Sequence, residues 1–385
     1  MLCLFLVCAA ACRSGDGEPL SRTDIARAQV NPQATNFLIQ AQQALDRGIL
    51  NRALAFADSA VALEPDLADA HFMRGRTLAA ARQYGEAEQS YNEALARDPA
   101  YVIARFDLGN IAYGQDRFQE ALTRYLEILE VGNLEDVGPE DLPASLEKDR
   151  ITASLVQIGR TYVKLGAFDE ARNAYDLALV VDSTDAMVHN DFGIMLRDDG
   201  DISRAILHAR KALDLEPAMI DYRYFLGALL VQQGRYEDAI PYLEQVIAQR
   251  PWQQGAHFNL GQALIRTSQT DAGMQMLALA DSVQLWQTDI DQTKANVDND
   301  ANRPENWIEL GKAYLRAGRY VDAAEAFQYV LQFLPEHEAA RYNMAVVWEK
   351  TGEVARARQL LRGILKTNPS HKPAQALLDQ LKVSY

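Results

Sequence analysis

The sequence contains very little cysteine and histidine, and this scarcity limits the chemistry open to the protein. Its three cysteines, Cys3, Cys8 and Cys12, all lie near the start of the 385 residues. The body of the chain therefore has neither a disulfide framework nor a cysteine zinc site. Six histidines are scattered along the chain, and no P-loop, HExxH, GxSxG or CxxC motif occurs. We expect no metal site, no cofactor and no catalytic residues, and hence a protein that is not an enzyme.

Basic residues are also in deficit. The 38 lysines and arginines face 53 aspartates and glutamates, and the net charge is -15. A protein that binds nucleic acid needs a concentrated basic surface to neutralise phosphates. We therefore expect no nucleic-acid partner.

The N-terminal residues predict export. Residues 2–11 form an apolar run of ten, half of the roughly 20 residues that a bilayer-spanning helix needs. The run fits a signal peptide over residues 1–12. Residues 9–12, Ala-Ala-Ala-Cys, resemble the lipobox of bacterial lipoproteins, which implies lipid attachment at Cys12. An ordinary cleaved signal with an incidental cysteine is the alternative.

A polar tether is expected to follow over residues 13–33. Arg13, rather than an aspartate, follows the cysteine. In lipoproteins of two-membrane bacteria this resembles sorting to the outer membrane. The expected location is the cell envelope, on the periplasmic side of that membrane.

The dominant feature of the remaining chain is a repeat of 34 residues. The eighth and twentieth residues of each unit are small, the twenty-fourth is mostly bulky, and proline closes six of the units. Apolar residues recur at helical spacing on two stretches of each unit, separated near residue fifteen by glycine or polar residues. The nine units begin at Ala34, Ala68, Val102, Thr152, Ala186, Ile220, Gln254, Pro304 and Glu338.

This spacing suits two helices packed antiparallel, because small residues permit close approach where a bulky one fills the adjacent space. Proline stops the second helix, since it lacks an N–H group. Units such as the one with Trp307, Gly311, Ala323, Phe327 and Pro335 resemble the tetratricopeptide repeat. The resemblance covers roughly residues 34–371. It implies an all-α fold: a right-handed superhelical solenoid of about nine helix-turn-helix units.

Two interruptions of sixteen residues divide the repeats. Residues 136–151 form an acidic insertion with two prolines, and residues 288–303 are an insertion or an extended helix. Units 1–3 then occupy residues 34–135, units 4–7 residues 152–287 and units 8–9 residues 304–371. Each interruption is either a plain insertion or a contact for a partner. Residues 372–385 are expected to form a capping helix, because a solenoid's last unit has no neighbour to cover it.

In tetratricopeptide repeat proteins the first helix of each unit lines a concave groove, with residues six, nine and thirteen of the unit among those that face it. Basic and amide groups at these places would hold an extended peptide, including an acidic one. A solvated face with a random mixture of charges is the alternative. The candidate groove residues are Arg76, Asn110, Arg160, Lys164, Asp191, Asn259, Gln262, Arg266, Lys312, Arg316 and Asn343.

Two further sets of residues recur at fixed places. His71, His189 and His257 occupy the fourth place of their units, where packing between helices is favoured over a metal ladder. Aromatic residues at the fifth place could form apolar pockets in the groove or belong to the core. These are Phe72, Phe106, Tyr224, Phe258 and Tyr342.

The resemblance implies a non-enzymatic scaffold that binds a protein or peptide partner and is held at a membrane by its N-terminal lipid. Bacterial lipoproteins of this architecture commonly help to assemble envelope machinery such as pili, peptidoglycan synthases or outer-membrane complexes. A regulatory subunit of an envelope enzyme or assembly machine is an alternative function. A hydrolase or transferase with a hidden site is a third.

Overall fold

The computed structural model describes residues 31–135 and 137–383, and every regular element in those residues is a helix. The expected signal peptide, the lipid attachment at Cys12 and residues 13–30 of the expected tether lie outside the described residues. The first described helix, α2, begins at Pro32, two residues before the expected start of unit 1.

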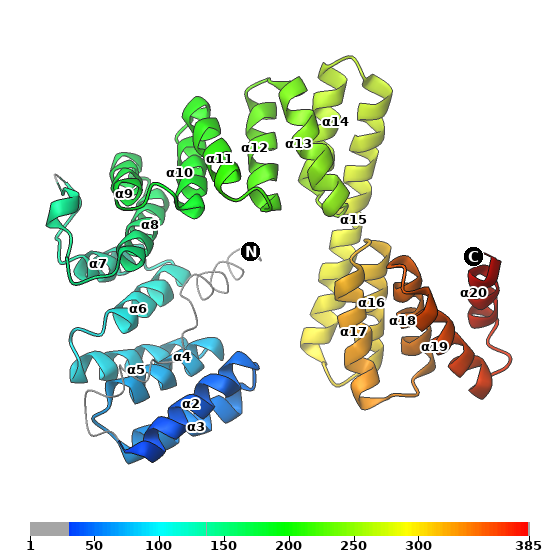
Figure 1. Ribbon diagram of the computed structural model, residues 1–385, viewed down its shortest axis with the longest axis horizontal. Coiled ribbons are helices and arrows are strands. Elements are labelled where there is room, and N and C mark those ends of the chain that lie inside the picture. Colours follow the sequence, from blue (N-terminus) through cyan, green and yellow to red (C-terminus); the bar gives the residue numbers. More distant parts are fainter. Residues whose placement is uncertain (1–30, 136, 384–385) are drawn as a thin grey trace. The chain divides into compact units, whose positions relative to one another are not determined.

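Nine antiparallel helix pairs follow one another along the described chain, and a single helix succeeds them (Figure 1). The predicted all-α helix-turn-helix solenoid is therefore confirmed. The chain divides into two compact parts between Leu215 and Glu216. The helices of the first part are α2 (Pro32–Asp46), α3 (Leu50–Leu63), α4 (Ala68–Ala80), α5 (Tyr84–Arg97), α6 (Val102–Gly114), α7 (Phe118–Ile128), η2 (Pro139–Asp141), α8 (Lys148–Leu165), α9 (Phe168–Val181), α10 (Ala186–Asp198) and α11 (Ile202–Leu215).

The second part contains the last four pairs and the final helix. Each pair packs on the next through its second helix. The helices of this part are α12 (Ile220–Gln232), α13 (Tyr236–Gln249), α14 (Gln254–Arg266), α15 (Thr270–Asn299), α16 (Pro304–Arg316), α17 (Tyr320–Phe333), α18 (Glu338–Lys350), α19 (Val354–Thr367) and α20 (Lys372–Val383).

In six of the nine pairs the two helices touch where glycine at the eighth place meets a large residue at the twenty-fourth. A Cβ atom added to Gly311 would lie 2.4 Å from a ring carbon of Phe327, and one added to Gly109 would lie 2.5 Å from Tyr125. Phe327 and Tyr125 are completely buried. Glycine therefore provides the space that the aromatic ring fills, and this contact sets the distance between the paired helices.

The turns between the paired helices share one backbone feature in all nine units. The residue at the fifteenth place has a positive φ, between 60° and 90°. Glycine, which adopts this conformation without steric cost, occupies six of these places. The other three places hold Arg82, Asp116 and Ser268. In these residues the left-handed conformation is sterically unfavourable because they have a Cβ atom.

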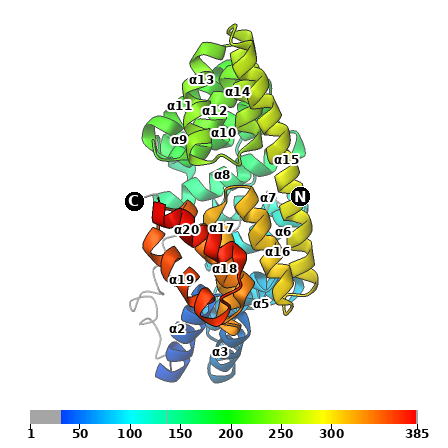
Figure 2. The same ribbon diagram turned by 90° about the vertical axis from the view of Figure 1, so that its right-hand side faces the viewer.

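The two interruptions have different structures. The first holds a short 3-10 helix, η2, and α8 then begins at Lys148, four residues before the expected start of unit 4. The second is continuous with the repeat: α15 runs for 30 residues, from Thr270 to Asn299. This helix packs on α14 and continues alongside α16 (Figures 1 and 2). Ile290 and Val297 from its extension are buried against Leu310 and Ala313 of α16.

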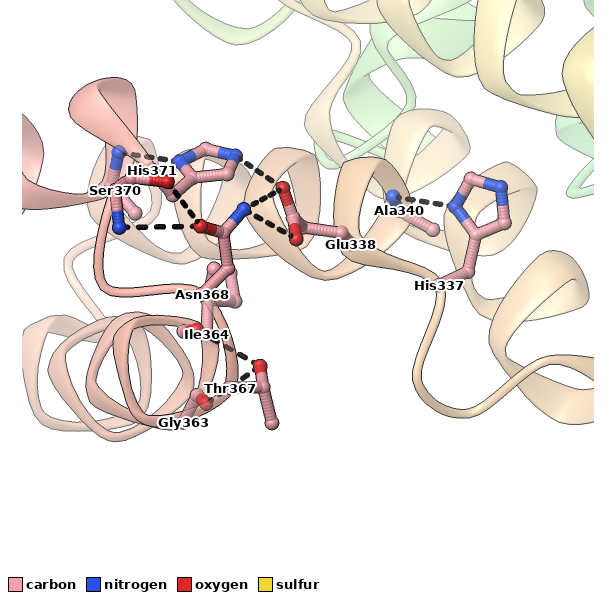
Figure 3. Close-up of polar contacts among 10 residues, drawn as sticks. His337, Glu338, Ala340, Gly363, Ile364, Thr367, Asn368, Ser370 and His371 are labelled. Atoms are coloured by element: carbon pink, nitrogen blue, oxygen red, sulfur yellow. Dashed lines mark hydrogen bonds and ion pairs between the residues drawn. The ribbon is translucent and has the colours of Figure 1, made fainter.

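The final helix, α20, covers the end of the last pair. Ala374, Leu378 and Leu381 are buried in one cluster with Leu361 and Ile364 of α19. Polar contacts fix the connection, as Figure 3 shows. The Asn368 side-chain amide donates to both carboxylate oxygens of Glu338, at 3.0 and 3.1 Å. His371 pairs with the same carboxylate through Nε2, and its Nδ1 accepts from the Ala374 N–H to cap α20.

Candidate functional site

The candidate groove residues lie on the first helices of the pairs, which contact one another directly in both parts of the chain. In the first part α2 contacts α4 and α8 contacts α10; in the second part α12 contacts α14 and α16 contacts α18. Side chains at the sixth and ninth places lie at these seams between first helices. We call the side chains at the sixth, ninth and thirteenth places of the first helices the first-helix face.

Two predicted groove residues are brought together in the first part. The Arg160 guanidinium on α8 binds the Asp191 carboxylate on α10, with Nε–Oδ2 and Nη2–Oδ2 distances of 2.8 and 2.5 Å. Asp191 is 9% exposed. Burial raises the pKa of Asp191, and the charge of Arg160 opposes that rise. Because removing one member of a buried pair leaves an uncompensated charge, Arg160 serves first to join two repeats.

Tyrosine side chains at the twenty-fourth place, on the second helices, pass the glycines of the eighth place and reach the first-helix face. The Tyr125 hydroxyl donates to Asn110 Oδ1 at 2.8 Å. The Tyr91 hydroxyl similarly bonds the Asp107 carboxylate. Burial raises the pKa of Asp107 to about 6, although the charge of Arg76 and the hydrogen bonds from Tyr91 and Asn110 act in the opposite direction.

Arg76 also joins two first helices. Its Nη1 donates to Gln42 Oε1 on α2 at 3.0 Å, and its guanidinium lies 5.7 Å from the centre of the Phe72 ring. Most polar side chains on this part of the first-helix face therefore already form hydrogen bonds or ion pairs with one another in the unbound chain.

The second part shows the same internal pairing of cations. Lys312 Nζ lies 2.8 Å from a carboxylate oxygen of Glu309, and Arg316 pairs with Asp289 on the extension of α15. Asn343 is 8% exposed, whereas Asn259 and Gln262 are half-buried.

Lys164 and Arg266 differ from the other predicted cations. Both are exposed, both occupy the thirteenth place of their units, and neither forms an ion pair with the described residues. They are the predicted groove cations whose charge is most available to a partner. Of the others, Arg160, Lys312 and Arg316 form ion pairs with Asp191, Glu309 and Asp289.

Sequence reasoning did not assign Asp289, Gln42 and the tyrosine hydroxyls to this face. Asp289 falls within the second interruption, and the sequence pattern marks the twenty-fourth place only as a bulky residue that fills the space between paired helices. The signal available in the sequence was the repeated tyrosine at the twenty-fourth place, fifteen residues after the ninth, as in Asn110 and Tyr125.

The aromatic residues of the fifth place are not equivalent. Phe72 is buried against Tyr91 and Tyr101, with ring centres 5.7 and 5.0 Å apart. Phe258 is 44% exposed. Phe72 therefore belongs to the core, whereas Phe258 presents part of its ring as an apolar contact surface.

The histidines of the fourth place are engaged in local structure. His71 and His257 each contact, through Nε2, the backbone carbonyl six residues earlier, both at 2.8 Å. His189 makes the same contact at 3.2 Å, and its Nδ1 lies 3.0 Å from Nδ1 of His208. In the described ranges no three residues among His, Cys, Asp and Glu gather as metal ligands would. No described helix has the length and apolar character needed to cross a bilayer.

Comparison with known proteins gives a consistent result. One tetratricopeptide repeat model matches residues 230–284 and 300–381, and another matches residues 38–101, 72–133 and 156–220. Together these matches cover well over half of the chain. Proteins of this family bind protein or peptide partners, and the fold is typically a non-enzymatic scaffold.

Individual relatives are distant. Tetratricopeptide repeat protein 8 of Caenorhabditis elegans is 20% identical over 232 residues, covering 60% of this chain and 43% of that protein. Superkiller complex protein 3 of Mus musculus is 22% identical over 386 residues, covering 97% of this chain and 20% of that protein. The chain spans less than half the length of the curated relatives it matches.

Among solved structures, Pseudomonas aeruginosa pilF is 17% identical with a TM-score of 0.48, covering 58% of this chain and 95% of that one. YrrB, described as a tetratricopeptide repeat protein with an unusual peptide-binding site, is 19% identical with a TM-score of 0.39, covering 52% of this chain and 95% of that one. The family matches, the repeated glycine–aromatic contact and the nine helix pairs agree: the chain belongs to the tetratricopeptide repeat family, whose members act as protein–protein interaction scaffolds.

Proposed function

We propose that this protein is an envelope scaffold that binds an extended segment of another protein along its first-helix face. An N-terminal lipid at Cys12 would hold it at the membrane, on the periplasmic side of the outer membrane in a two-membrane cell. The partner carries acidic groups, which pair with Lys164 in the first part of the chain and, separately, with Arg266 in the second.

The observation that carries this proposal is the difference between paired and unpaired cations on the first-helix face. Arg160, Lys312 and Arg316 form ion pairs with carboxylates of the chain itself, and the Arg160–Asp191 pair is the most buried of the three. Lys164 and Arg266, at the thirteenth place of their units, are exposed and form no ion pair with the described residues. Charge-assisted hydrogen bonds from such cations to a carboxylate are stronger than neutral ones.

Fixed side chains also favour binding because a partner then orders fewer groups on association. The hydroxyl of Tyr125 is held by Asn110, and the Asp191 carboxylate is held by Arg160. The side-chain amides at the ninth place have further hydrogen-bond donors and acceptors, and these can pair with a peptide backbone.

Site-specific photocrosslinking in the native cell tests the face. A benzophenone amino acid replaces Lys164 on α8, and in the matched control it replaces Asp169, an exposed residue on the second helix α9. The proposal expects one discrete adduct from position 164, identified by mass spectrometry, and little from position 169. Equal adducts from both positions would contradict it.

Metabolic labelling with a fatty-acid analogue tests the anchor separately. Label on the parent and its loss, together with release from the membrane fraction, in Cys12→Ser would support lipid attachment. An unlabelled parent with unchanged fractionation of the variant would refute it.

A further inference from the structure

The acidic interruption between units 3 and 4 forms a hollow that the first-helix face does not include. Its volume is about 370 Å³, and Pro139, Leu142, Pro143, Leu146, Ile151 and Val181 supply most of its apolar lining. Residues from η2, the following loop, α8 and α9 meet here, all within the first part of the chain. Small-molecule and side-chain pockets in proteins begin at about 300 Å³, so the hollow can hold a large apolar side chain.

The wall formed by the interruption is ordered by its own contacts. The Gly138 N–H donates to Asp141 Oδ2 at 2.8 Å, and the Asp141 N–H donates to the Gly138 carbonyl at 3.1 Å. Leu142 is 8% exposed and anchors the loop in the core. Two prolines further restrict the loop in the unbound chain. The hollow is therefore built before a ligand enters, which lowers the entropy cost of binding.

The charges around the hollow indicate the charge of the partner that it can bind. Lys148 lines it but pairs with Asp182, at 3.3 Å. Glu140 also lines it, is exposed and has no ion pair among the described residues. Asp141 is exposed nearby in sequence, whereas Glu147 pairs with Arg150 at 3.5 Å. The charge available at the rim is thus negative, opposite to that of Lys164 and Arg266.

We propose that this hollow is a second protein-binding site, which takes a large apolar side chain from a partner segment that carries lysine or arginine beside it. The apolar lining holds the anchor side chain, and Glu140 pairs with the adjacent cation. The site is separate from the first-helix face, so it does not depend on the function proposed above.

Fluorescence anisotropy with a defined peptide tests the site in the full chain. The probe is a fluorescein-labelled peptide, Gly-Lys-Arg-Phe-Lys-Gly, compared with versions that carry serine in place of phenylalanine or glutamates in place of the basic residues. We expect saturable binding of the first peptide, and at least tenfold weaker binding of the other two. Absence of saturation, or equal binding of the serine peptide, would overturn the proposal.

Two pairs of variants locate the binding. Ala144 lines the hollow and is exposed, whereas its neighbour Ser145 is also exposed but does not line it. Ala144→Trp should weaken binding at least tenfold, and Ser145→Trp should leave it within twofold. Equal effects of the two tryptophans would refute the location.

The second pair changes charge. Glu140→Lys should weaken binding at least threefold at low salt, since it removes the partner of the peptide cation. Asp149→Lys makes the same charge change away from the hollow and should have a smaller effect. Equal weakening by the two lysines would leave only a general attraction to acidic surface and would contradict a built site. Circular dichroism melts of all four variants confirm that each is folded.

Discussion

Substitution of Gly311 by alanine tests the contact that sets the spacing of the helix pairs. The added Cβ atom would lie 2.4 Å from a ring carbon of Phe327, closer than unbonded carbons approach. Phe327 is completely buried, so its ring has no free space to enter. Overpacking of this kind costs about 1–3 kcal/mol. Alanine is favoured over glycine inside a helix by roughly 0.5–1 kcal/mol. The expected net loss is about 1–2 kcal/mol.

Hydrogen exchange followed by mass spectrometry measures this loss locally, because a repeat protein need not unfold in one step. Peptides from α16 and α17 should exchange about five- to thirty-fold faster in Gly311→Ala than in the parent. Gly85→Ala is the matched control. No atom lies within 4 Å of a Cβ added there, so the helix containing it should gain stability.

A second substitution tests whether the aromatic ring is the cause. Gly227 and Gly261 face Leu243 and Leu277 instead of an aromatic residue, at closest distances of 3.0 and 2.9 Å. Phe327→Leu should therefore relieve part of the cost of alanine at position 311, which a double-mutant cycle measures. If Gly311→Ala exchanges as slowly as the parent, or if the leucine does not reduce its effect, the packing account is wrong.

Three further predictions concern stability. Ser268→Gly should stabilise α14 and α15 by up to about 1 kcal/mol because Ser268 has a φ of 64°, and Gly318→Ser should be destabilising by a similar amount; urea titration compares them. The pKa of Asp107 is raised to about 6, so its contribution to stability is lost as pH rises from 4 through 6. Asp107→Asn should reduce that loss in urea titrations at pH 5 and 7.5. The pKa of His208 is lowered to about 4, so its contribution is lost as pH falls from 6.5 through 4; His208→Phe should have a smaller loss in the same titration. Unchanged pH profiles in these variants would contradict the assigned causes.

The repeat pattern predicts the fold almost completely. Glycine at the eighth place and a large residue at the twenty-fourth are local, periodic signals, and they correspond to the contact between Gly109 and Tyr125. Proline and glycine likewise mark the helix ends and turns. At Ser268 the turn conformation persists without glycine, because the helices on either side determine it.

The candidate site is less predictable because it depends on contacts between units. The sequence places Arg160 and Asp191 at groove positions but does not reveal that they neutralise each other across two helices. Arg316 depends on Asp289, which is available only because α15 continues as a helix through the second interruption. These pairings leave Lys164 and Arg266 as the exposed predicted groove cations that form no ion pair with the described residues.

The most direct test of the scaffold function is the affinity for the partner segment identified by crosslinking at position 164. Its dissociation constant is measured for the parent, for Lys164→Glu with Arg266→Glu, and for Arg210→Glu with Arg362→Glu, which reverses exposed cations on second helices. At least tenfold weaker binding by the first pair, with binding by the second pair within twofold of the parent, is the predicted result. Equal affinity for all three proteins would contradict binding along the first-helix face.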